Sequence, residues 1–247
     1  MLQIGFKCNR GVVRKNNEDA CFLIPNQDVY IVADGVGGEN CGEIASKIAV
    51  NGVMTTLKDS LAFIDSKDEL PQFLKVIFNR VNIMILHDCL ENRERMGMCT
   101  TLTVALLKGT ELTIAHIGDT RGYLLHGSEL IKLTEDHNEA GKLVKQGLLS
   151  EDEAKYHPGR SRLFKVVGEN QYLNPDIYSY NISYGDLVFL CSDGLYSYMS
   201  NEQFKACTME RNKPESICSK LIAQALEGES TDNITVTVVR AEPVTEL

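Results

Sequence analysis

Residues 29–35 read Val-Tyr-Ile-Val-Ala-Asp-Gly, a short apolar run that stops at an acidic residue followed by glycine. Such a run of β-branched and aromatic residues is typical of a buried strand. Two later segments, residues 113–119 and 187–194, repeat the pattern of an apolar run that ends beside an aspartate. A strand end holds a side chain on a rigid base. The pattern therefore predicts a sheet with an acidic rim.

The remaining apolar runs extend this pattern and favour an α+β fold with antiparallel sheet. The strand candidates are residues 4–8, 20–24, 29–33, 101–107, 112–117, 122–125, 187–191 and 234–239. Apolar residues recur at helical spacing in residues 44–53, about 71–93 and 217–226. Glycine turns at residues 109–110, 127–128 and 185–186 are typical of hairpins between antiparallel neighbours. Consecutive strands, interrupted by one helical pair, argue against a series of βαβ units.

Length and composition are those of an ordinary globular protein. The 247 residues are interpreted as one domain, residues 1–247, because no Pro- or Ser-rich linker divides them. The polar segment at about 138–174 is expected to form short helices in an insertion beside the main sheet. The net charge of −9 disfavours nucleic-acid binding. No apolar run approaches the roughly 18 residues that span a bilayer, so we expect no membrane contact and a cytoplasmic location.

The cysteines and histidines do not indicate a metal or redox centre. No two of the eight cysteines are closer than ten positions, which disfavours a zinc site of the CxxC type. Most of them are expected to be buried thiols. His116, His137 and His157 are expected to be structural residues of the sheet or loops.

Aspartates at the ends of strand candidates point to a different kind of metal site. These aspartates are Asp34, Asp119, Asp193 and, just before the last strand candidate, Asp232. A single Asp-Gly pair is ordinary turn chemistry and predicts only a turn. Carboxylates gathered at one rim, however, repel one another strongly unless a cation lies between them. Ligation by oxygen alone favours Mg²⁺ or Mn²⁺ over zinc.

The segment before the second strand candidate adds a candidate for binding phosphate. Arg14 carries a guanidinium group, which can hold a phosphate through two parallel hydrogen bonds. Taken alone, Arg14 is better interpreted as an exposed loop arginine. Phosphoryl transfer at two metal ions about 3.5 to 4 Å apart needs no side-chain nucleophile, because the ions acidify a bridging water.

Short motifs in a fixed order along the chain carry a family resemblance. They are Arg14-x-x-Asn17-Glu18-Asp19, Val32-Ala33-Asp34-Gly35-Val36-Gly37-Gly38, Thr100-Thr101-Leu102, Gly118-Asp119-Thr120-Arg121, Leu133-Thr134-x-Asp136-His137, Cys191-Ser192-Asp193-Gly194-Leu195 and Asp232-Asn233-Ile234-Thr235. Together they closely resemble the metal-dependent protein phosphatases of the PPM, or protein phosphatase 2C, type, and particularly the compact bacterial members. The resemblance runs from about residue 3 to residue 240.

The resemblance implies a four-layer α-β-β-α sandwich of two antiparallel sheets. The metal site would lie in a cleft at one end of the sheets, and the insertion at about 138–174 would be the family's flap. By resemblance, Asp34 bridges two metal ions and the Gly35 carbonyl binds the first of them. Asp193 and Asp232 would bind the second ion.

The resemblance also implies roles for the residues around these ligands. Glu18 would reach the first metal ion through water, and Arg14 would bind the phosphate. Asp19 resembles a hydrogen-bonding partner of metal-bound water, a kind of residue that tunes the ligands it touches. Asp119, together with Asp193, would hold a third and weaker ion.

The implied function is hydrolysis of phosphoserine and phosphothreonine monoesters on proteins by a hydroxide that bridges two Mn²⁺ or Mg²⁺ ions, without a phosphoenzyme. The partners would be phosphorylated proteins, and a serine/threonine kinase would be the counterpart. The alternative is a catalytically weak regulatory module of the same fold that binds phosphoproteins. The complete set of ligands favours the enzyme.

One departure from the family pattern concerns the acid that protonates the leaving alcohol. The family often places a histidine shortly after the Asp-Gly pair, whereas Val36 and Glu39 occupy those positions here. Glu39, metal-bound water and a group from the flap all remain candidates for this acid.

Overall fold

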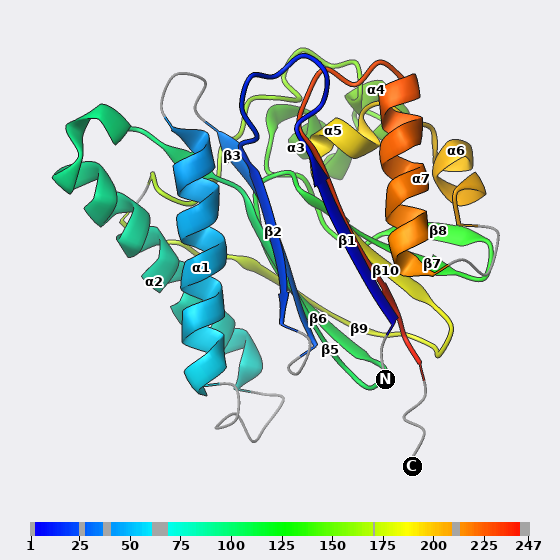
Figure 1. Ribbon diagram of the computed structural model, residues 1–247, viewed down its shortest axis with the longest axis horizontal. Coiled ribbons are helices and arrows are strands. Elements are labelled where there is room, and N and C mark those ends of the chain that lie inside the picture. Colours follow the sequence, from blue (N-terminus) through cyan, green and yellow to red (C-terminus); the bar gives the residue numbers. More distant parts are fainter. Residues whose placement is uncertain are drawn as a thin grey trace.

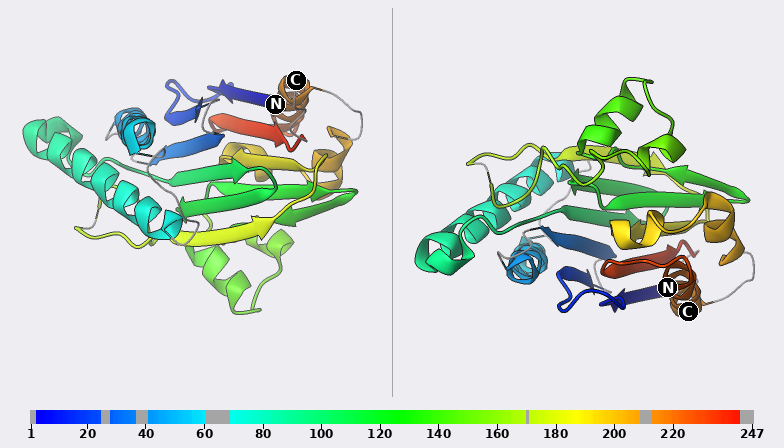
Figure 2. Two further views of the ribbon diagram at one scale, coloured as in Figure 1. Left: turned by 90° about the horizontal axis from the view of Figure 1, so that it is seen from below. Right: turned by 90° about the horizontal axis from the view of Figure 1, so that it is seen from above.

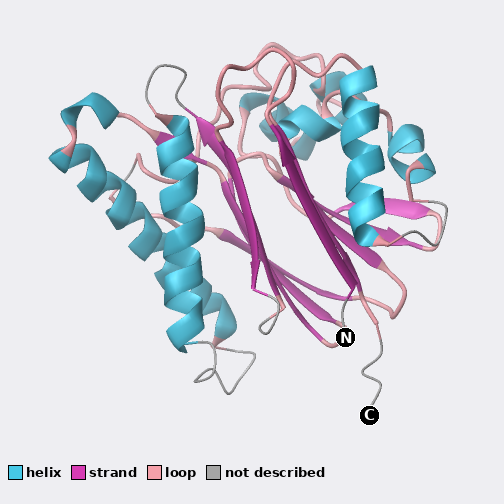
Figure 3. Cartoon of the chain, in the orientation of Figure 1, coloured by secondary structure: helices cyan, strands magenta, loops and turns pink. Residues whose placement is uncertain are grey.

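The computed structural model describes residues 3–24, 28–36, 41–60, 69–169, 171–208 and 213–242. Two antiparallel sheets lie face to face, and helices cover the outer face of each sheet, which gives four layers (Figure 1). Figure 3 separates the helical layers from the strands, and Figure 2 shows the stack from below and from above. The α-β-β-α sandwich predicted from the sequence is confirmed.

Every strand pairs antiparallel with its neighbours. The first sheet has the order β1-β11-β10-β7-β8, and the second has the order β2-β3-β5-β6-β9 with β4 paired to β3. The strands of the first sheet are β1 (Gln3–Asn9), β7 (Arg121–His126), β8 (Glu129–Lys132), β10 (Leu187–Cys191) and β11 (Ile234–Arg240). Those of the second sheet are β2 (Asp19–Ile24), β3 (Val29–Val36), β4 (Cys99–Thr100), β5 (Leu102–Lys108), β6 (Glu111–Ile117) and β9 (Asp176–Asn181).

Helices lie on both outer faces and at the upper end of the sandwich in Figure 1. The helices are α1 (Gly42–Ser60), α2 (Leu70–Glu91), η3 (Arg93–Arg95), α3 (Glu139–Lys145), α4 (Glu151–Ala154), α5 (Asp193–Tyr196), α6 (Asn201–Ala206) and α7 (Pro214–Glu227). Proline in the first turn of α2 and of α7 suits these helix starts, because its missing N–H would have no partner there. In the described part of the chain, no helix combines the length and apolar character needed to cross a membrane.

Strand β3 shows how alternating side chains build the layers. Val29, Ile31 and Ala33 pack under α1 and α2. Tyr30 and Val32, on the opposite face, belong to the apolar layer between the two sheets. Because both faces are covered, the strand reads as a continuous apolar run. A third apolar cluster packs α5, α6 and α7 against the first sheet.

The glycine turns are only partly as predicted. Gly109 and Gly127 have φ of 63° and 59° and join the paired strands β5–β6 and β7–β8. The hairpin predicted at Gly185 is wrong, because β9 lies in the second sheet and β10 in the first. The turn at Gly185, with φ of 93°, therefore carries the chain from one sheet to the other.

Strand β3 also extends further than the apolar run that predicted it. Gly35 and Val36 pair with Thr100 and Cys99 of β4, so the strand continues past the acidic residue. Strands β4, β8 and β9 were not predicted, because they are short or carry polar residues with little burial. The short helices expected at about 138–174 are present as α3 and α4, which protrude from the sandwich in Figure 2.

Candidate active site

A polar cavity of about 230 Å³ lies at the end of the sandwich where the loop between β1 and β2 approaches α5 and the flap (Figure 1). Its lining residues are Arg14, Glu18, Asp34, Gly35, Val36, Asp119, Ser161, Leu163, Asp193, Asp232 and Asn233. Seven of the eight residues predicted for the site are among them, and Asp19 is the exception. The predicted acidic rim is thus gathered around one space.

The backbone of Asp34 is held on both sides by two threonines. Its N–H donates to Thr101 Oγ1 at 2.9 Å, and its carbonyl accepts from Thr101 N and from Thr100 Oγ1, each at 2.8 Å. Burial raises the pKa of the Asp34 carboxyl well above its ordinary value, and repulsion from the neighbouring aspartates adds to the rise. A carboxylate that is fixed in place and is costly to ionise without a counter-charge is well placed to bind a cation.

Gly35 and Gly42 are required by close packing of the backbone beside Asp34. A Cβ built on either glycine would overlap the other residue's backbone. A Cβ on Gly42 would also lie 2.5 Å from Glu18 Oε2, so this carboxylate is close to the first residue of α1. Burial and repulsion from Glu43 raise the pKa of Glu18. Another negative charge is thereby placed at the edge of the cavity.

The loop that carries Arg14 and Glu18 is held by one asparagine. Asn233 donates through Nδ2 to the carbonyls of Arg10 and Asn16 at 2.8 and 2.9 Å, and its Oδ1 accepts from Glu18 N at 2.8 Å. Asn233 thus fixes a loop that has no regular secondary structure. In the sequence, Asn233 stands out only as part of the Asp232-Asn233-Ile234-Thr235 motif. Its role depends on a contact across more than 200 positions, which no local pattern reveals.

Arg14 makes an ion pair with Asp232 in this structure. Arg14 Nη2 lies 2.8 Å from Asp232 Oδ2, and the two side chains are 48% and 29% exposed. The guanidinium is therefore open to solvent beside the cavity and close to the acidic cluster.

Asp19 lies outside the cavity lining and is buried beneath it. It pairs in register with Asp34 across β2 and β3, and its Oδ2 accepts from Ser192 Oγ at 2.7 Å. Burial, with repulsion from Asp193 and Asp232, raises the pKa of Asp19 to about 7. Among the described residues, Asp19 Oδ1 has no hydrogen-bond partner. A buried oxygen without a partner normally has a ligand or water to bind.

Asp119 and Asp193 come from opposite sheets. Asp119 follows β6, where Gly118 has φ of 108° and packs on Thr101. Asp193 is the first residue of α5, directly after β10. Burial, with repulsion from Asp232, raises the pKa of Asp193 to about 6. Burial also raises the pKa of Asp119, and repulsion from Asp193 adds to it.

These residues fit divalent metal ions by their chemistry. All of the ionisable ligands are carboxylates, which suit Mg²⁺ or Mn²⁺, and their mutual repulsion is relieved by a cation. In the present side-chain arrangement, no three acidic, histidine or cysteine side chains within the described ranges converge on one ion. Asp232 is directed instead toward Arg14, whose positive charge offsets part of the acidic cluster.

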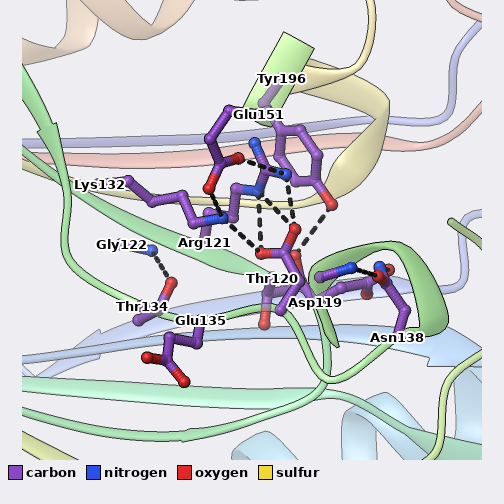
Figure 4. A network of polar contacts seen from close by, with 12 residues as sticks. Asp119, Thr120, Arg121, Gly122, Lys132, Thr134, Glu135, Asn138, Glu151 and Tyr196 are labelled. Carbon is purple, nitrogen blue, oxygen red and sulfur yellow. Dashed lines mark hydrogen bonds and ion pairs between the residues drawn. The ribbon is translucent and has the colours of Figure 1, made fainter. Parts of the chain in front are cut away.

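A buried network beneath the cavity supports Asp119 (Figure 4). Tyr196 donates through its hydroxyl to the Asp119 carbonyl at 3.0 Å, and Asn138 Nδ2 donates to Asp119 Oδ2 at 3.2 Å. The Arg121 guanidinium lies 3.7 Å from the centre of the Tyr196 ring and bonds both oxygens of Asp136. Burial alone would raise the pKa of Asp136, but Arg121 and Lys132 lower it.

The same network ties the flap to the sandwich. Glu151, in flap helix α4, lies 2.6 Å from Lys132 Nζ and 3.5 Å from Arg121 Nη2. In the sequence, Arg121 and Asp136 stand out only as parts of motifs, and no role was predicted for them. Their signal was a pair of opposite charges next to apolar strand candidates, since buried charges are usually paired.

A larger and mainly apolar groove opens beside the polar cavity. It has a volume of about 820 Å³ and shares Val36, Ser161 and Leu163 with the cavity. Its other lining residues are Leu86, Cys89, Leu90, Met96, Gly97, Cys99, Arg162, Val166, Gly168, Glu169 and Gln171. Leu90 and Met96 are 75% and 54% exposed. The end of α2, η3 and the flap thus form an apolar surface next to the acidic site.

The candidates for the leaving-group acid are not brought together. Glu39 lies outside the described residues, and Val36, which lines the cavity, has no proton to donate. Among the lining residues that are described, none is a histidine. His116 and His137 are buried outside the cavity lining. His116 hydrogen-bonds to Thr103, and His137 hydrogen-bonds to Asp176.

Comparisons with known proteins bear on the whole chain. A family model described as Protein phosphatase 2C matches residues 12–227. The serine/threonine phosphatase stp of Listeria welshimeri is 31% identical over 95% of this chain and 94% of its own length. The crystal structure of serine/threonine phosphatase Stp1 from Staphylococcus aureus superimposes with a TM-score of 0.92 at 29% identity, covering 98% of this chain and 96% of that chain.

A further solved structure contains metal. The catalytic domain of serine threonine protein phosphatase PstP, in complex with 2 manganese ions, has a TM-score of 0.84 to this chain. It is 30% identical and covers 97% of both chains.

Proposed function

The chain belongs to the protein phosphatase 2C family, and from this premise we propose that its acidic cavity is the active site of a metal-dependent serine/threonine phosphatase. The enzyme is a protein-serine/threonine phosphatase of the PPM type. The observation that carries the assignment to this cavity is the gathering of Arg14, Asp34, Asp193 and Asp232 around one space.

The carboxylates are assigned to two divalent ions, Mn²⁺ or Mg²⁺. Asp34 and the Gly35 carbonyl would hold one ion, with Glu18 close by. Asp34, Asp193 and Asp232 would hold the other. The manganese ions of the PstP catalytic domain support this assignment. So does the pKa of Asp34, which burial raises and repulsion from the neighbouring aspartates raises further.

A third and weaker ion is assigned to Asp119 and Asp193. Both carboxylates line the cavity. Asp119 accepts one hydrogen bond from Asn138, which orients its carboxylate and leaves an oxygen for a ligand. The buried network around Arg121 and Tyr196 keeps this loop in place.

The side chains of the chain itself bind and orient the phosphate and the attacking water. Arg14 is exposed at the cavity, and its guanidinium can donate two parallel hydrogen bonds to phosphate oxygens. Asp19 holds a free acceptor, Oδ1, for a hydrogen bond from water, while Ser192 fixes its other oxygen. The bound ions would supply activation of that water and neutralise charge that develops on the phosphate.

The groove beside the cavity favours phosphorylated proteins over small phosphate esters as substrates. A phosphoserine or phosphothreonine side chain that enters the cavity leaves its polypeptide at the shared wall formed by Val36 and Leu163. The adjoining apolar surface at Leu90 and Met96 then binds an apolar side chain near the phosphorylated residue. A serine/threonine kinase that phosphorylates the same proteins is the expected counterpart.

The alternative, a weakly catalytic binding module, requires loss of metal ligands, and none of the predicted ligands is missing. The test is phosphate release from a phosphothreonine peptide with Mn²⁺, with EDTA and in Asp34→Asn. We expect release with Mn²⁺ alone and none in the two controls. Peptide binding without phosphate release under all conditions would favour the binding module. Glu129→Gln, at an exposed carboxylate on edge strand β8, should behave like the wild type.

A further inference from the structure

Two cysteines on facing edge strands lie unusually close together. The prediction that most cysteines are buried holds for only four of the eight, and Cys8 is exposed. Cys8 Sγ in β1 lies 3.0 Å from Cys21 Sγ in β2. These strands form the edges of different sheets and run side by side in Figure 1. Both thiols are free in this structure.

The geometry is close to that needed for a covalent link. A disulfide has an S–S distance of about 2.05 Å, so the two sulfurs need to approach by only about 1 Å. Cys8 is open to solvent, whereas Cys21 is half-buried and packs against the apolar layer between the sheets. The Cys8 sulfur is therefore accessible to an oxidant in solution, and the Cys21 sulfur lies next to it on the less exposed side.

The neighbours of Cys8 favour its thiolate form. Thr235 Oγ1 donates to Cys8 Sγ at 3.1 Å, and the Cys21 thiol can donate to it as well. The hydrogen bond from Cys21 is the main reason that the pKa of Cys8 lies below its ordinary value, although partial desolvation of the sulfur by its neighbours opposes the shift. The thiolate is the reactive form of cysteine.

The pair is also connected to the buried aspartate under the cavity. Thr235, which bonds Cys8, donates through its N–H to Ser192 Oγ at 3.0 Å, and Ser192 donates to Asp19 Oδ2 at 2.7 Å. Cys21 follows Asp19 by two positions on β2, so their side chains share a face of that strand. A covalent change at the two sulfurs can therefore affect Asp19 in two ways, through the hydrogen bonds of Thr235 and Ser192 and through the backbone of β2.

We propose that Cys8 and Cys21 form an oxidative modification site, at which a hydroperoxide converts the two thiols into a disulfide that links the two sheets. Cys8 thiolate attacks the peroxide, the O–O bond breaks, and a sulfenic acid and hydroxide form. Cys21 sulfur then attacks the sulfenic sulfur, the S–O bond breaks, and the departing oxygen leaves as water with the thiol proton. In total, two thiols and one hydrogen peroxide give a disulfide and two waters.

The disulfide is expected to lower phosphatase turnover, and this second step rests on the proposed function. Thr235 loses a thiolate acceptor, and the shift of β1 and β2 moves Asp19 relative to Ser192. Changes in residues that orient metal ligands commonly cost about tenfold or more in activity. We expect a comparable fall in kcat on oxidation, reversed by a dithiol.

The test treats the full chain with stoichiometric hydrogen peroxide in the presence of Mg²⁺ and maps the peptides by mass spectrometry. The expected product is a Cys8–Cys21 cross-linked peptide that has lost two hydrogen atoms and is restored by dithiothreitol. Cys8→Ser, which keeps an acceptor for Thr235, should form no cross-link, whereas Cys207→Ala should form it like the wild type. Recovery of Cys8 as an unlinked sulfinic acid, or of both thiols unmodified, would overturn the site.

The activity readout is separate. If kcat of the cross-linked wild type falls and kcat of peroxide-treated Cys8→Ser does not, the connection to Asp19 is supported. If the cross-link forms and kcat is unchanged in an enzyme that hydrolyses the peptide normally, the connection is wrong. Failure of the proposed function itself would appear earlier, as absence of hydrolysis in the untreated protein, and would leave the peptide map unaffected.

Discussion

Replacing Asp193 by asparagine is expected to stabilise the metal-free protein while abolishing its phosphatase activity. Asparagine keeps the shape of the side chain but removes a charge that lies among other carboxylates in the cavity. Burial and repulsion from Asp232 raise the pKa of Asp193 from 3.8 to about 6. At about 1.4 kcal/mol per pKa unit, ionised Asp193 costs the folded state about 3 kcal/mol.

The pH dependence of this difference follows from the direction of the pKa shift. Below the unfolded pKa of 3.8 the carboxyl is protonated in both states, and the substitution has no electrostatic effect. As pH rises toward 6 the folded state holds its proton longer than the unfolded state, so the stability of the wild type falls relative to Asp193→Asn. Above pH 6 the full difference is present.

The assay is urea unfolding in EDTA at pH 4 and at pH 8. Asp193→Asn should gain up to about 3 kcal/mol over the wild type at pH 8 and little at pH 4. With Mn²⁺ at a hundred times its Kd this advantage should largely disappear, because each ion that only the wild type binds adds about 2.7 kcal/mol to the stability of the wild type. Glu129→Gln should change neither result. A variant that is less stable than the wild type at pH 8 in EDTA would refute the reasoning.

Three further predictions concern phosphate binding, substrate choice and acid stability. Arg14→Ala should lower kcat/KM for a phosphothreonine peptide by roughly ten- to a hundredfold, chiefly through KM, since a charged hydrogen-bond donor to phosphate is worth about 1.5 to 3 kcal/mol. Steady-state kinetics and inhibition by free phosphate measure this effect. An unchanged KM would contradict the role of Arg14 in phosphate binding. Leu90→Asp should raise KM about tenfold, or about 1.4 kcal/mol, for a peptide with an apolar residue near the phosphothreonine, but it should leave p-nitrophenyl phosphate hydrolysis unchanged. The control Ile83→Asp, at a position on α2 that is 60% exposed and lies outside the groove, should leave both unchanged. Burial, with the nearby His137, lowers the pKa of His116 to about 3, so only the unfolded chain gains this proton as the pH falls below 6.5. The free energy of unfolding should therefore drop more steeply in the wild type than in His116→Gln, by up to about 1.4 kcal/mol per pH unit. Equal slopes of the unfolding free energy against pH, measured by urea unfolding, would contradict the assignment.

The sequence predicts those parts of the fold that depend on local patterns. Strand β3 is covered on both faces, so it is a continuous apolar run that stands out from its surroundings. Strand β9 is only partly buried, and its polar residues Asp176, Ser179 and Asn181 do not alternate regularly with apolar ones, so the sequence does not separate it from a loop. Helices α4 and α6 did carry a usable signal, because Ser150 with Glu153, and Ser200 with Gln203, form capping boxes.

The sequence also predicts which side chains reach the cavity, because strand ends and motifs mark them. Asp34 and Asp193 end apolar runs, and both line the cavity as expected. Local reasoning does not find what holds them. Asn233 fixes the Arg14 loop from the other end of the chain, and Tyr196 holds the Asp119 carbonyl from 77 positions further along the chain. Such contacts depend on how the two sheets are stacked, which no local window contains.

The apolar groove illustrates the same limit. The stripe on α2 is core, as predicted, at residues such as Leu74 and Phe78. Beyond Ile85 the same helix turns Leu86 and Leu90 toward the flap and forms one wall of the groove. Helical spacing cannot separate these two uses of apolar residues, because both faces read as apolar.

The most direct test of the account is a titration of the metal-free enzyme with Mn²⁺ that follows bound metal and phosphate release from a phosphothreonine peptide in the same samples. The account predicts that hydrolysis appears only as two ions bind and that Asp232→Asn loses the second ion together with turnover. Full phosphate release by protein that holds no Mn²⁺ or other divalent ion would contradict it.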